Sequence, residues 1–255
     1  AMVVGLPLGR MVGLWLGWRQ TFGCVCAVSA LVLAYLAVVF PKIPASKPFT
    51  LKQLPSILRN KVLMGIFAIA VCLAVVFKDQ VFPPDYTGYS YIEPFLLQVG
   101  GMDEQVVTMA LVAFGIAGLV GSAICSRFYR GHRWAFAVWV VAGVALALLL
   151  LRPAALGIVG VFVVCMLWGI AGSGYSIVYQ AEIIEFASDG EQTVAMAIFS
   201  GIFNLGIGTG SFIGGGVCTF DTIADVGFVG ALIAFLALLY CAFVLIKYMK
   251  AQSQR

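Results

Sequence analysis

The stretch AMVVGLPLGRMVGLWLGWRQTF, residues 1–22, is almost wholly apolar and repeats glycine at a spacing of four. Glycine weakens a helix in water, and proline can break it. In a membrane, small residues at this spacing form a smooth face against which another helix backbone packs closely. The spacing returns in GIFNLGIGTGSFIGGGV, residues 201–217. Together the two stretches predict a set of helix-packing residues: Gly5, Pro7, Gly9, Gly13, Gly17, Gly206, Gly210 and Gly214.

The composition of the chain also indicates a membrane setting. Of its 255 residues, 62% are hydrophobic and only 10% are charged, whereas a soluble domain is roughly half apolar and about a quarter charged. We therefore expect an all-α polytopic membrane protein. The net charge of +4 is too small to indicate a nucleic-acid partner. The sequence has no metal-ligand spacing, phosphate-binding loop or nucleophile motif, so we expect no enzyme, no catalytic residues, no cofactor and no metal.

The apolar runs predict about eight transmembrane helices, since roughly 20 apolar residues cross about 30 Å of hydrocarbon. These runs are residues 1–17, 20–40, 61–77, 105–125, 134–151, 155–179, 193–219 and 226–246. Longer polar connectors lie at residues 41–60, 126–133 and 180–192. The first connector contains an amphipathic pattern that predicts a short helix on the inner membrane surface: Leu51, Leu54, Ile57 and Leu58.

The distribution of positive charge predicts the orientation of these helices. Eleven of the 15 Lys and Arg residues fall in residues 42–61, 127–133 and 247–255, which would all lie on one face. The face rich in Lys and Arg is cytoplasmic, so the long linker and the C-terminus are expected inside. Residues 180–192 would lie on the same face, although they carry four acidic residues and no basic one.

The two glycine-rich spans occur in matching surroundings. Each is followed by a short turn and then by one plain apolar helix, residues 20–40 in the first case and residues 226–246 in the second. Helix pairs related in parallel are typical of a transporter built from two six-helix halves; the alternative is two unrelated packing faces. The chain starts at Ala1 within an apolar run, so we expect a fragment or a truncated gene product that lacks its N-terminal part.

At these motifs the chain resembles the major facilitator superfamily. GLPLGRMVGLWLGWRQTF resembles the fifth helix of its drug/proton antiporter branch. YSYIEPFLLQVGGM and LVAFGIAGLVGSAICSRF are similar to helices seven and eight of the bacterial sugar-efflux and multidrug-efflux members. FNLGIGTGSFIGGGV is similar to their eleventh helix. The resemblance covers essentially the whole chain and implies family helices five to twelve.

The resemblance implies an organisation and a function. Residues 1–40 would be the last two helices of the N-terminal half, 41–60 a basic cytoplasmic linker, 61–250 the six-helix C-terminal half and 251–255 a cytoplasmic tail. The protein would lie in the bacterial inner membrane and export sugars or small drug-like molecules in exchange for protons by alternating access. Its partners would be the lipid bilayer and the missing helices, from the same gene or a separate chain. Otherwise we expect a monomer.

Six side chains are candidates for the substrate or proton pathway: Arg10, Tyr89, Tyr91, Glu93, Tyr175 and Asn204. Ionisable groups at membrane depth usually face a cavity, which favours a substrate contact over snorkelling for Arg10. Glu93 lies among aromatic residues that would favour its neutral form by desolvation, but a surface position beside Pro94 fits equally well. Asn204 could bind a sugar hydroxyl or join two helices. Tyr175 lies deeper in its span than an interfacial anchor would.

Two features depart from the family pattern. The loop after the eighth family helix keeps Arg127, Arg130 and Arg133 but lacks the Asp of the family motif. We therefore expect the charge contact that closes the inner face to be absent from this half. Residues 74–88 contain paired prolines in a stretch longer than the family pattern, which indicates an inserted outer loop or a reading error.

A second hypothesis comes from another class of protein. The chain would then be a truncated or non-transporting membrane protein that binds partner helices through its glycine faces. Under the first hypothesis the missing helices supply half of the substrate cavity, so we expect the chain alone not to transport.

Overall fold

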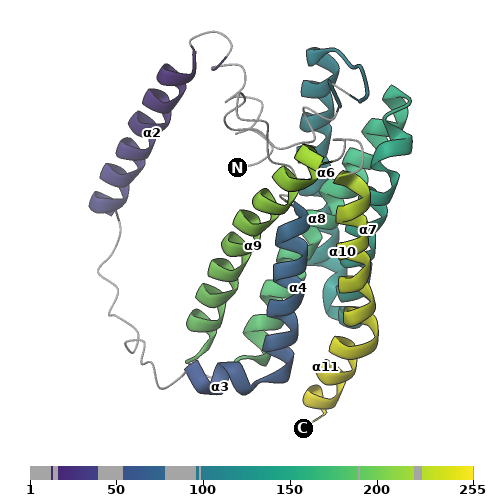
Figure 1. The fold of residues 1–255 in the computed structure, drawn as a ribbon. Helices are drawn as coiled ribbons and strands as arrows, with labels where there is room; N and C mark the ends of the chain where they lie inside the picture. Colours follow the sequence, from purple (N-terminus) through teal and green to yellow (C-terminus); the bar gives the residue numbers. More distant parts are fainter. Residues whose placement is uncertain are drawn as a thin grey trace. The chain divides into compact units, whose positions relative to one another are not determined.

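The computed structural model describes residues 13, 17–39, 54–77, 96–97, 99–188, 190–220 and 226–254. The chain consists of two compact units, Ala1–Phe49 and Thr50–Arg255. Helices account for nearly all of the described residues, and no strand occurs among them (Figure 1).

The described part of the first unit is one apolar helix, α2 (Trp18–Val39). It begins directly after Gly17, whose φ of +82° lies in the left-handed region that glycine adopts without strain. The N–H of Gly17 donates to the carbonyl oxygen of Gly13 at 3.0 Å, and its own carbonyl accepts from the N–H of Thr21 at 3.2 Å. Gly17 therefore forms the turn into α2. A Cβ at Gly17 would meet no atom within 4 Å, and its place in a helix-packing face stays a prediction.

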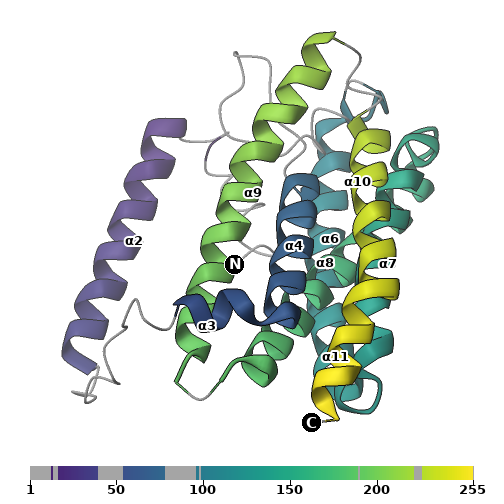
Figure 2. The same ribbon diagram turned by 60° about the horizontal axis from the view of Figure 1, so that its bottom comes forward.

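The second unit is a bundle of helices (Figure 2). The short helix α3 (Leu54–Arg59) leads into α4 (Lys61–Phe77). The elements that follow are α6 (Glu104–Phe128), the 3₁₀ turn η2 (Tyr129–Gly131), α7 (Arg133–Ala154), α8 (Ile158–Phe186), α9 (Gln192–Phe220), α10 (Val226–Tyr240), the π-helical turn η4 (Cys241–Leu245) and α11 (Ile246–Ser253). The principal packing partners are α6 with α8, α7 with α8, α4 with α9, and α7 with α10.

These helices coincide with seven of the eight spans expected from the sequence, while residues 1–17 lie almost entirely outside the described residues. Within the described ranges, five helices are long and apolar enough to cross a membrane: Arg19–Val39, Glu104–Gly131, Arg133–Ala154, Ile158–Phe186 and Phe228–Ser253. The helices α4 and α9 are apolar as well. The clearest difference is that α8 continues to Phe186 through part of the expected polar connector.

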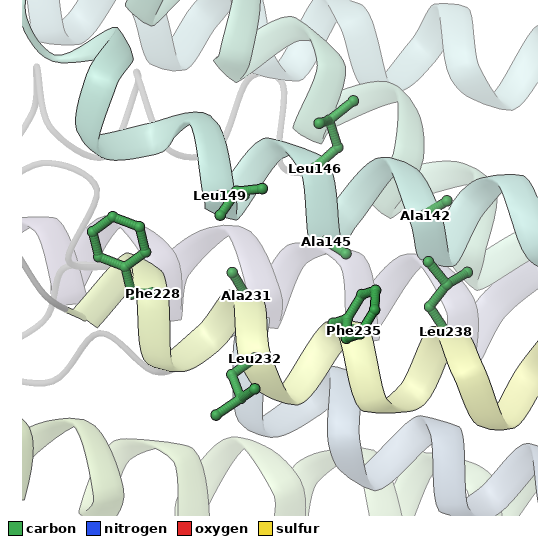
Figure 3. Close-up of a pocket in the computed structure, with 9 residues that line it drawn as sticks. All are labelled: Ala142, Ala145, Leu146, Leu149, Phe228, Ala231, Leu232, Phe235 and Leu238. Atoms are coloured by element: carbon green, nitrogen blue, oxygen red, sulfur yellow. The ribbon is translucent and has the colours of Figure 1, made fainter.

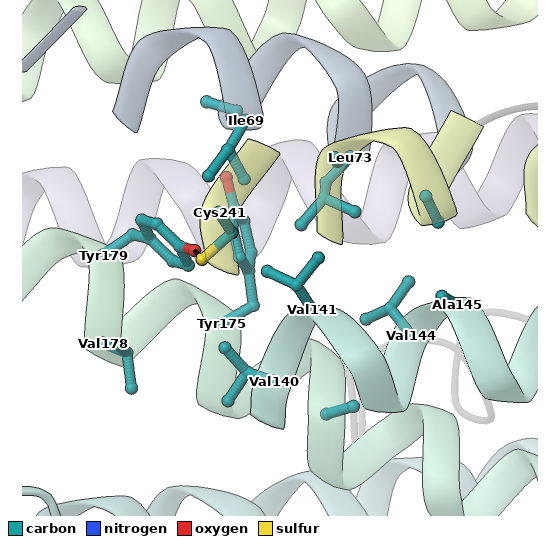
Figure 4. Packing of buried hydrophobic residues seen from close by; sticks show 14 of the residues in the cluster. Ile69, Leu73, Val140, Val141, Val144, Ala145, Tyr175, Val178, Tyr179 and Cys241 are labelled. Atoms are coloured by element: carbon teal, nitrogen blue, oxygen red, sulfur yellow. Dashed lines mark hydrogen bonds between the residues drawn. The ribbon is translucent and has the colours of Figure 1, made fainter. Parts of the chain in front are cut away.

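The centre of the bundle is shown in Figure 4, where α4, α7, α8 and η4 meet. Ile69 and Leu73 of α4 lie close to Val141 of α7, with Tyr175 of α8 and Cys241 of η4 beside them. Each of these five side chains is at most 1% exposed. Lipid tails are as apolar as these side chains, so van der Waals packing rather than escape from water holds such helices together.

Glycine permits the closest helix crossings in this unit. A Cβ placed on Gly206 of α9 would lie 2.5 Å from the Cβ of Ala74 and 3.1 Å from the carbonyl oxygen of Val71, both in α4. A second close crossing, which the glycine spacing did not single out, joins α6 and α8. There, a Cβ on Gly121 would lie 2.6 Å from the carbonyl oxygen of Ile170. Both crossings depend on the absence of a side chain.

We predict that Gly206→Ala destabilises the bundle, because Ala74 and Val71 must move to admit one methyl group. Overpacking of this kind costs about 1–3 kcal/mol, and thermal unfolding of the purified protein in detergent measures it as a lower midpoint. Gly201→Ala and Gly208→Ala are matched controls in α9, since a Cβ at either position meets no atom within 4 Å. The controls should keep or slightly raise the midpoint, because alanine favours a helix. An equal loss in all three variants would contradict the prediction.

Candidate functional site

An ionic contact joins Arg133, the first residue of α7, to Glu182 near the end of α8. Nη2 of Arg133 donates to Oε2 of Glu182 at 2.8 Å, and Nε donates to Oε1 at 3.2 Å. This two-pronged geometry is typical of strong guanidinium–carboxylate pairs. The side chain of Glu182 is fully buried, whereas that of Arg133 is 22% exposed. Because a charge is buried at a large desolvation cost, the contact with Arg133 is what stabilises a carboxylate at this position.

Two further groups complete the contact. The hydroxyl of Tyr129 in η2 donates to Oε1 of Glu182. Nη1 of Arg133 donates to Oε1 of Glu185, one turn further along α8, at 3.1 Å. These four residues, Tyr129, Arg133, Glu182 and Glu185, are termed the ionic cluster. The cluster ties the end of α6 and the start of α7 to the end of α8.

Arg133 differs from the other two arginines of its loop. Its guanidinium carbon lies 5.2 Å from the ring centre of Trp134 and 5.7 Å from that of Phe186, distances at which an aromatic face attracts a cation. Arg127 and Arg130 are exposed. Of the three basic loop residues predicted as a group, the structure therefore places one in the ionic cluster.

An ionic contact is present at this loop, although the loop lacks the Asp of the family motif; α8 supplies the carboxylate that Arg133 binds. The expected absence of a contact that closes the inner face stays a prediction. Glu182 and Glu185 are three residues apart, so a helix that continues through them presents both on one side. That spacing was the available signal in the sequence. It was missed because residues 180–192 were assigned to a polar connector.

Asn60 joins the start of α4 to the end of α8. Its Oδ1 accepts from the N–H groups of Val62 at 3.1 Å and Leu63 at 3.4 Å. Its Nδ2 donates to the carbonyl oxygen of Phe186 at 2.9 Å. One amide thus satisfies terminal backbone groups of two helices, which lack partners within their own helices. Ile57 of α3 is fully buried, so this end of the linker packs against the bundle, and its place on the inner membrane surface stays a prediction.

Further contacts gather helix ends at the same end of the bundle. Oγ of Ser56 in α3 donates to Oε2 of Glu191 at 3.4 Å. Nζ of Lys61 at the start of α4 lies 5.5 Å from the ring centre of Tyr248 in α11, and Figure 2 shows α3 and α11 at this end. The basic residues described on the elements that meet here are Arg59, Lys61, Arg127, Arg130, Arg133, Lys247 and Lys250. Glu182 and Glu185 therefore pair with Arg133, Glu191 accepts a hydrogen bond from Ser56, and basic residues lie around all three.

Tyr175, a predicted pathway residue, is buried in the bundle. Its side chain is 1% exposed, and its ring centre lies 4.8 Å from that of Tyr179 and 6.4 Å from that of Phe203 in α9. The hydroxyl of Tyr179 donates to the carbonyl oxygen of Ala137 in α7 at 3.1 Å and lies 3.2 Å from the sulfur of Cys241 (Figure 4). In this conformation Tyr175 is part of an aromatic core and does not face an open surface.

Asn204 is exposed on α9. Its Nδ2 donates to the carbonyl oxygen of Ser200, one turn earlier in the same helix, at 2.8 Å. This bond stays within α9 and does not join two helices. A second polar pair lies on α8, where Nε2 of Gln180 donates to Oγ of Ser176 at 3.0 Å and both residues are partly exposed. The sequence did not single out this pair, because Gln180 was assigned to a connector.

Several predicted residues lie outside the described residues: Gly5, Pro7, Gly9, Arg10, Tyr89, Tyr91 and Glu93. Gly210 and Gly214 lie within α9, but their surroundings are not described. A Cβ on Gly13 would make an ordinary contact, 3.7 Å from Oγ1 of Thr21.

The helices define an all-α polytopic membrane protein whose described ionic contacts lie at helix ends. The chain is 36% identical, over 249 residues, to a probable sugar efflux transporter of Mannheimia succiniciproducens. The matched region covers 97% of this chain and 60% of that relative, so the chain spans about three fifths of the relative's length. No family model matches the chain.

We predict that Arg133→Gln destabilises the bundle more than Glu182→Gln. The first change leaves a fully buried carboxylate without its cation, which costs about 3–5 kcal/mol. The second leaves a partly exposed guanidinium and should cost about 1–3 kcal/mol. Denaturant unfolding in detergent measures both. Glu185→Gln is the control, because that side chain is 59% exposed and exposed pairs contribute at most about 1 kcal/mol.

The double variant of Arg133 and Glu182 tests whether the two residues act as a pair. Its loss of stability should be smaller than the sum of the single losses, because each single change leaves the other charge unmatched. Simple additivity would show that the contact contributes nothing to folding.

Asn60→Ser should remove one of the two functions of Asn60 and keep the other. Serine still accepts from the start of α4, but it is too short to donate to Phe186, so the expected loss is about 1 kcal/mol. Asn60→Ala should lose more, about 2 kcal/mol, because the cap of α4 is lost as well. Hydrogen exchange checks the assignment: the amides of Val62 and Leu63 should stay protected in the serine variant and exchange faster in the alanine variant. Similar exchange in both variants would refute it.

Proposed function

We propose that this chain forms the C-terminal part of a major facilitator-type transporter that exports a sugar. The observation that carries the proposal is the 36% identity to the Mannheimia relative, which extends over 97% of this chain rather than over one motif. The order of the described helices supports it, because α2, α4, α6, α7, α8, α9 and α10 to α11 follow one another as family helices six to twelve would. The partners in this proposal are the bilayer, the exported substrate, protons and the helices that complete the first half.

In this proposal the ionic cluster is a latch for alternating access. Transporters of this kind expose a central site to one side of the membrane at a time by moving one helix bundle against another. A buried two-pronged ion pair is either formed or hydrated and broken, so it has two discrete states. The cluster would be formed while its end of the bundle is closed. Water that enters this end on opening would release Arg133 from Glu182.

Polar side chains on accessible helix surfaces would bind the exported sugar. An amide donates and accepts hydrogen bonds, as sugar hydroxyls require. Asn204 on α9 and the Gln180–Ser176 pair on α8 offer such groups. We assign these residues to the pathway, together with Arg10. Proton coupling through Glu93 belongs to the same proposal.

The charge distribution supports an orientation for the bundle. The elements that meet near the ionic cluster carry most of the described Lys and Arg residues of the second unit, whereas Arg152 lies in the last turn of α7, at the other end of that helix from Arg133. Because the face rich in Lys and Arg is cytoplasmic, we infer that the ionic cluster and the C-terminus lie on the cytoplasmic side of a bacterial inner membrane.

Accumulation of a labelled sugar in cells that express this chain together with the helices that complete the first half tests the proposal. We expect lower accumulation than in cells that do not express the protein, and we expect a protonophore to abolish the difference. Asn204→Ala should lower export about fivefold, the equivalent of one hydrogen bond of about 1 kcal/mol. Gly208→Ala, at an exposed position one turn further along α9, should leave export unchanged. Equal sugar accumulation in cells with and without the expressed protein, despite its insertion into the membrane, would overturn the proposal.

The chain alone provides a second measurement. Purified and placed in proteoliposomes, the 255-residue chain should show no sugar uptake under a proton gradient, because it spans only 60% of its relative. Uptake would show that these helices suffice for transport. Co-purification with a separate four-helix chain would instead favour the second hypothesis, in which this chain is an assembly subunit that binds partner helices through its glycine faces.

A further inference from the structure

The helices α7 and α10 pack side by side and leave an open groove between them of about 410 Å³ (Figure 3). Alanines make the groove deep: Ala145 of α7 and Ala231 of α10 are only 8% and 7% exposed. Larger side chains form the walls, including Leu149 of α7 and Leu232 and Phe235 of α10. All lining residues are apolar, so the groove suits an apolar occupant.

The walls of the groove face outward from the bundle. Leu149 is 49% exposed, Leu232 61% and Phe235 50%. Both helices belong to segments that can cross a membrane, and at that depth an exposed apolar wall is in contact with hydrocarbon. The lining residues of α10 lie between Phe228 and Leu238, which are ten positions apart, or about 15 Å along the helix. One leaflet of the hydrocarbon core is about 15 Å thick, so the groove has the length of a single acyl chain.

A positive charge lies at one end of the groove. The guanidinium carbon of Arg152 lies 5.6 Å from the ring centre of Phe228, the lining residue at that end. Arg152 belongs to the last turn of α7, three residues beyond Leu149. An apolar groove of leaflet length with a cation at its rim matches a molecule that has one apolar tail and an acidic head.

We propose that the groove between α7 and α10 binds an acyl chain of an anionic phospholipid, whose phosphate lies against Arg152. Basic side chains attract acidic headgroups at the membrane surface, and the groove fixes the tail of the same molecule. The lipid site is independent of the proposed transport function.

Native mass spectrometry of the full chain in detergent tests the proposal, with palmitoyl-oleoyl phosphatidylglycerol and the matching phosphatidylcholine as probes. We expect one phosphatidylglycerol to be retained at least fivefold more tightly than phosphatidylcholine. Arg152→Gln should remove about fivefold of this preference, because a basic residue near the surface contributes about 1 kcal/mol towards an acidic lipid. Arg130→Gln, an exposed arginine on η2 near the ionic cluster, is the charge-matched control and should change nothing.

A variant that fills the groove tests the place of the tail. Ala231→Phe should weaken retention of phosphatidylglycerol, whereas Ala135→Phe, at an exposed position elsewhere on α7, should not. Equal retention of the two lipids, or equal effects of Arg152→Gln and Arg130→Gln, would overturn the proposal. So would a lipid-free dimer that Ala231→Phe dissociates, which would assign the groove to a second copy. If Ala231→Phe does not fold, the exposed Arg152→Gln variant still decides the outcome.

Discussion

Close approach of helix backbones is the constraint on which the second unit depends. Side chains of a membrane helix gain little by leaving lipid for protein, so association must come from dense contact. At Gly206 and Gly121 the neighbouring helix occupies the space that a side chain would need. These crossings fix α9 on α4 and α8 on α6. The aromatic and aliphatic side chains of the centre then fill the space that the crossings define.

The ionic contacts among the described residues are placed where the helices end. The ionic cluster and the bond from Asn60 both reach the last turn of α8, at Glu182 and at the carbonyl of Phe186. The end of α8 is thereby coupled to α7 by charge and to α4 by a backbone cap. A displacement of this one helix end would disturb both contacts together. If the chain works by the alternating access proposed above, an opening movement at this end would have to break both contacts.

Hydropathy was enough to predict where the described helices lie, because apolar length decides what can cross a membrane. It could not predict where α8 ends. The residues around Glu182 look like a loop, and the cost of burying that carboxylate is met by Arg133, 49 positions earlier in the chain. Spacing likewise placed Gly17 in a series of packing glycines, but could not predict its positive φ, which belongs to the turn before α2. For the candidate site, polarity singled out Asn204 but could not predict that its amide bonds within α9. Nor could the sequence predict that rings from α8 and α9 enclose Tyr175.

The π-helical turn η4 has a consequence for the end of the chain. It holds one residue more than an α-helical turn would, so the residues after it are rotated by about 100° relative to an uninterrupted helix. With this turn, Ile246 and Met249 are buried while Lys247 and Lys250 are exposed. If the same residues continued as an uninterrupted α-helix, Ile246 and Met249 would move into the places that Lys247 and Lys250 now occupy. The register of the final helix, and with it the side of α11 that meets water, is therefore set by the one extra residue in η4.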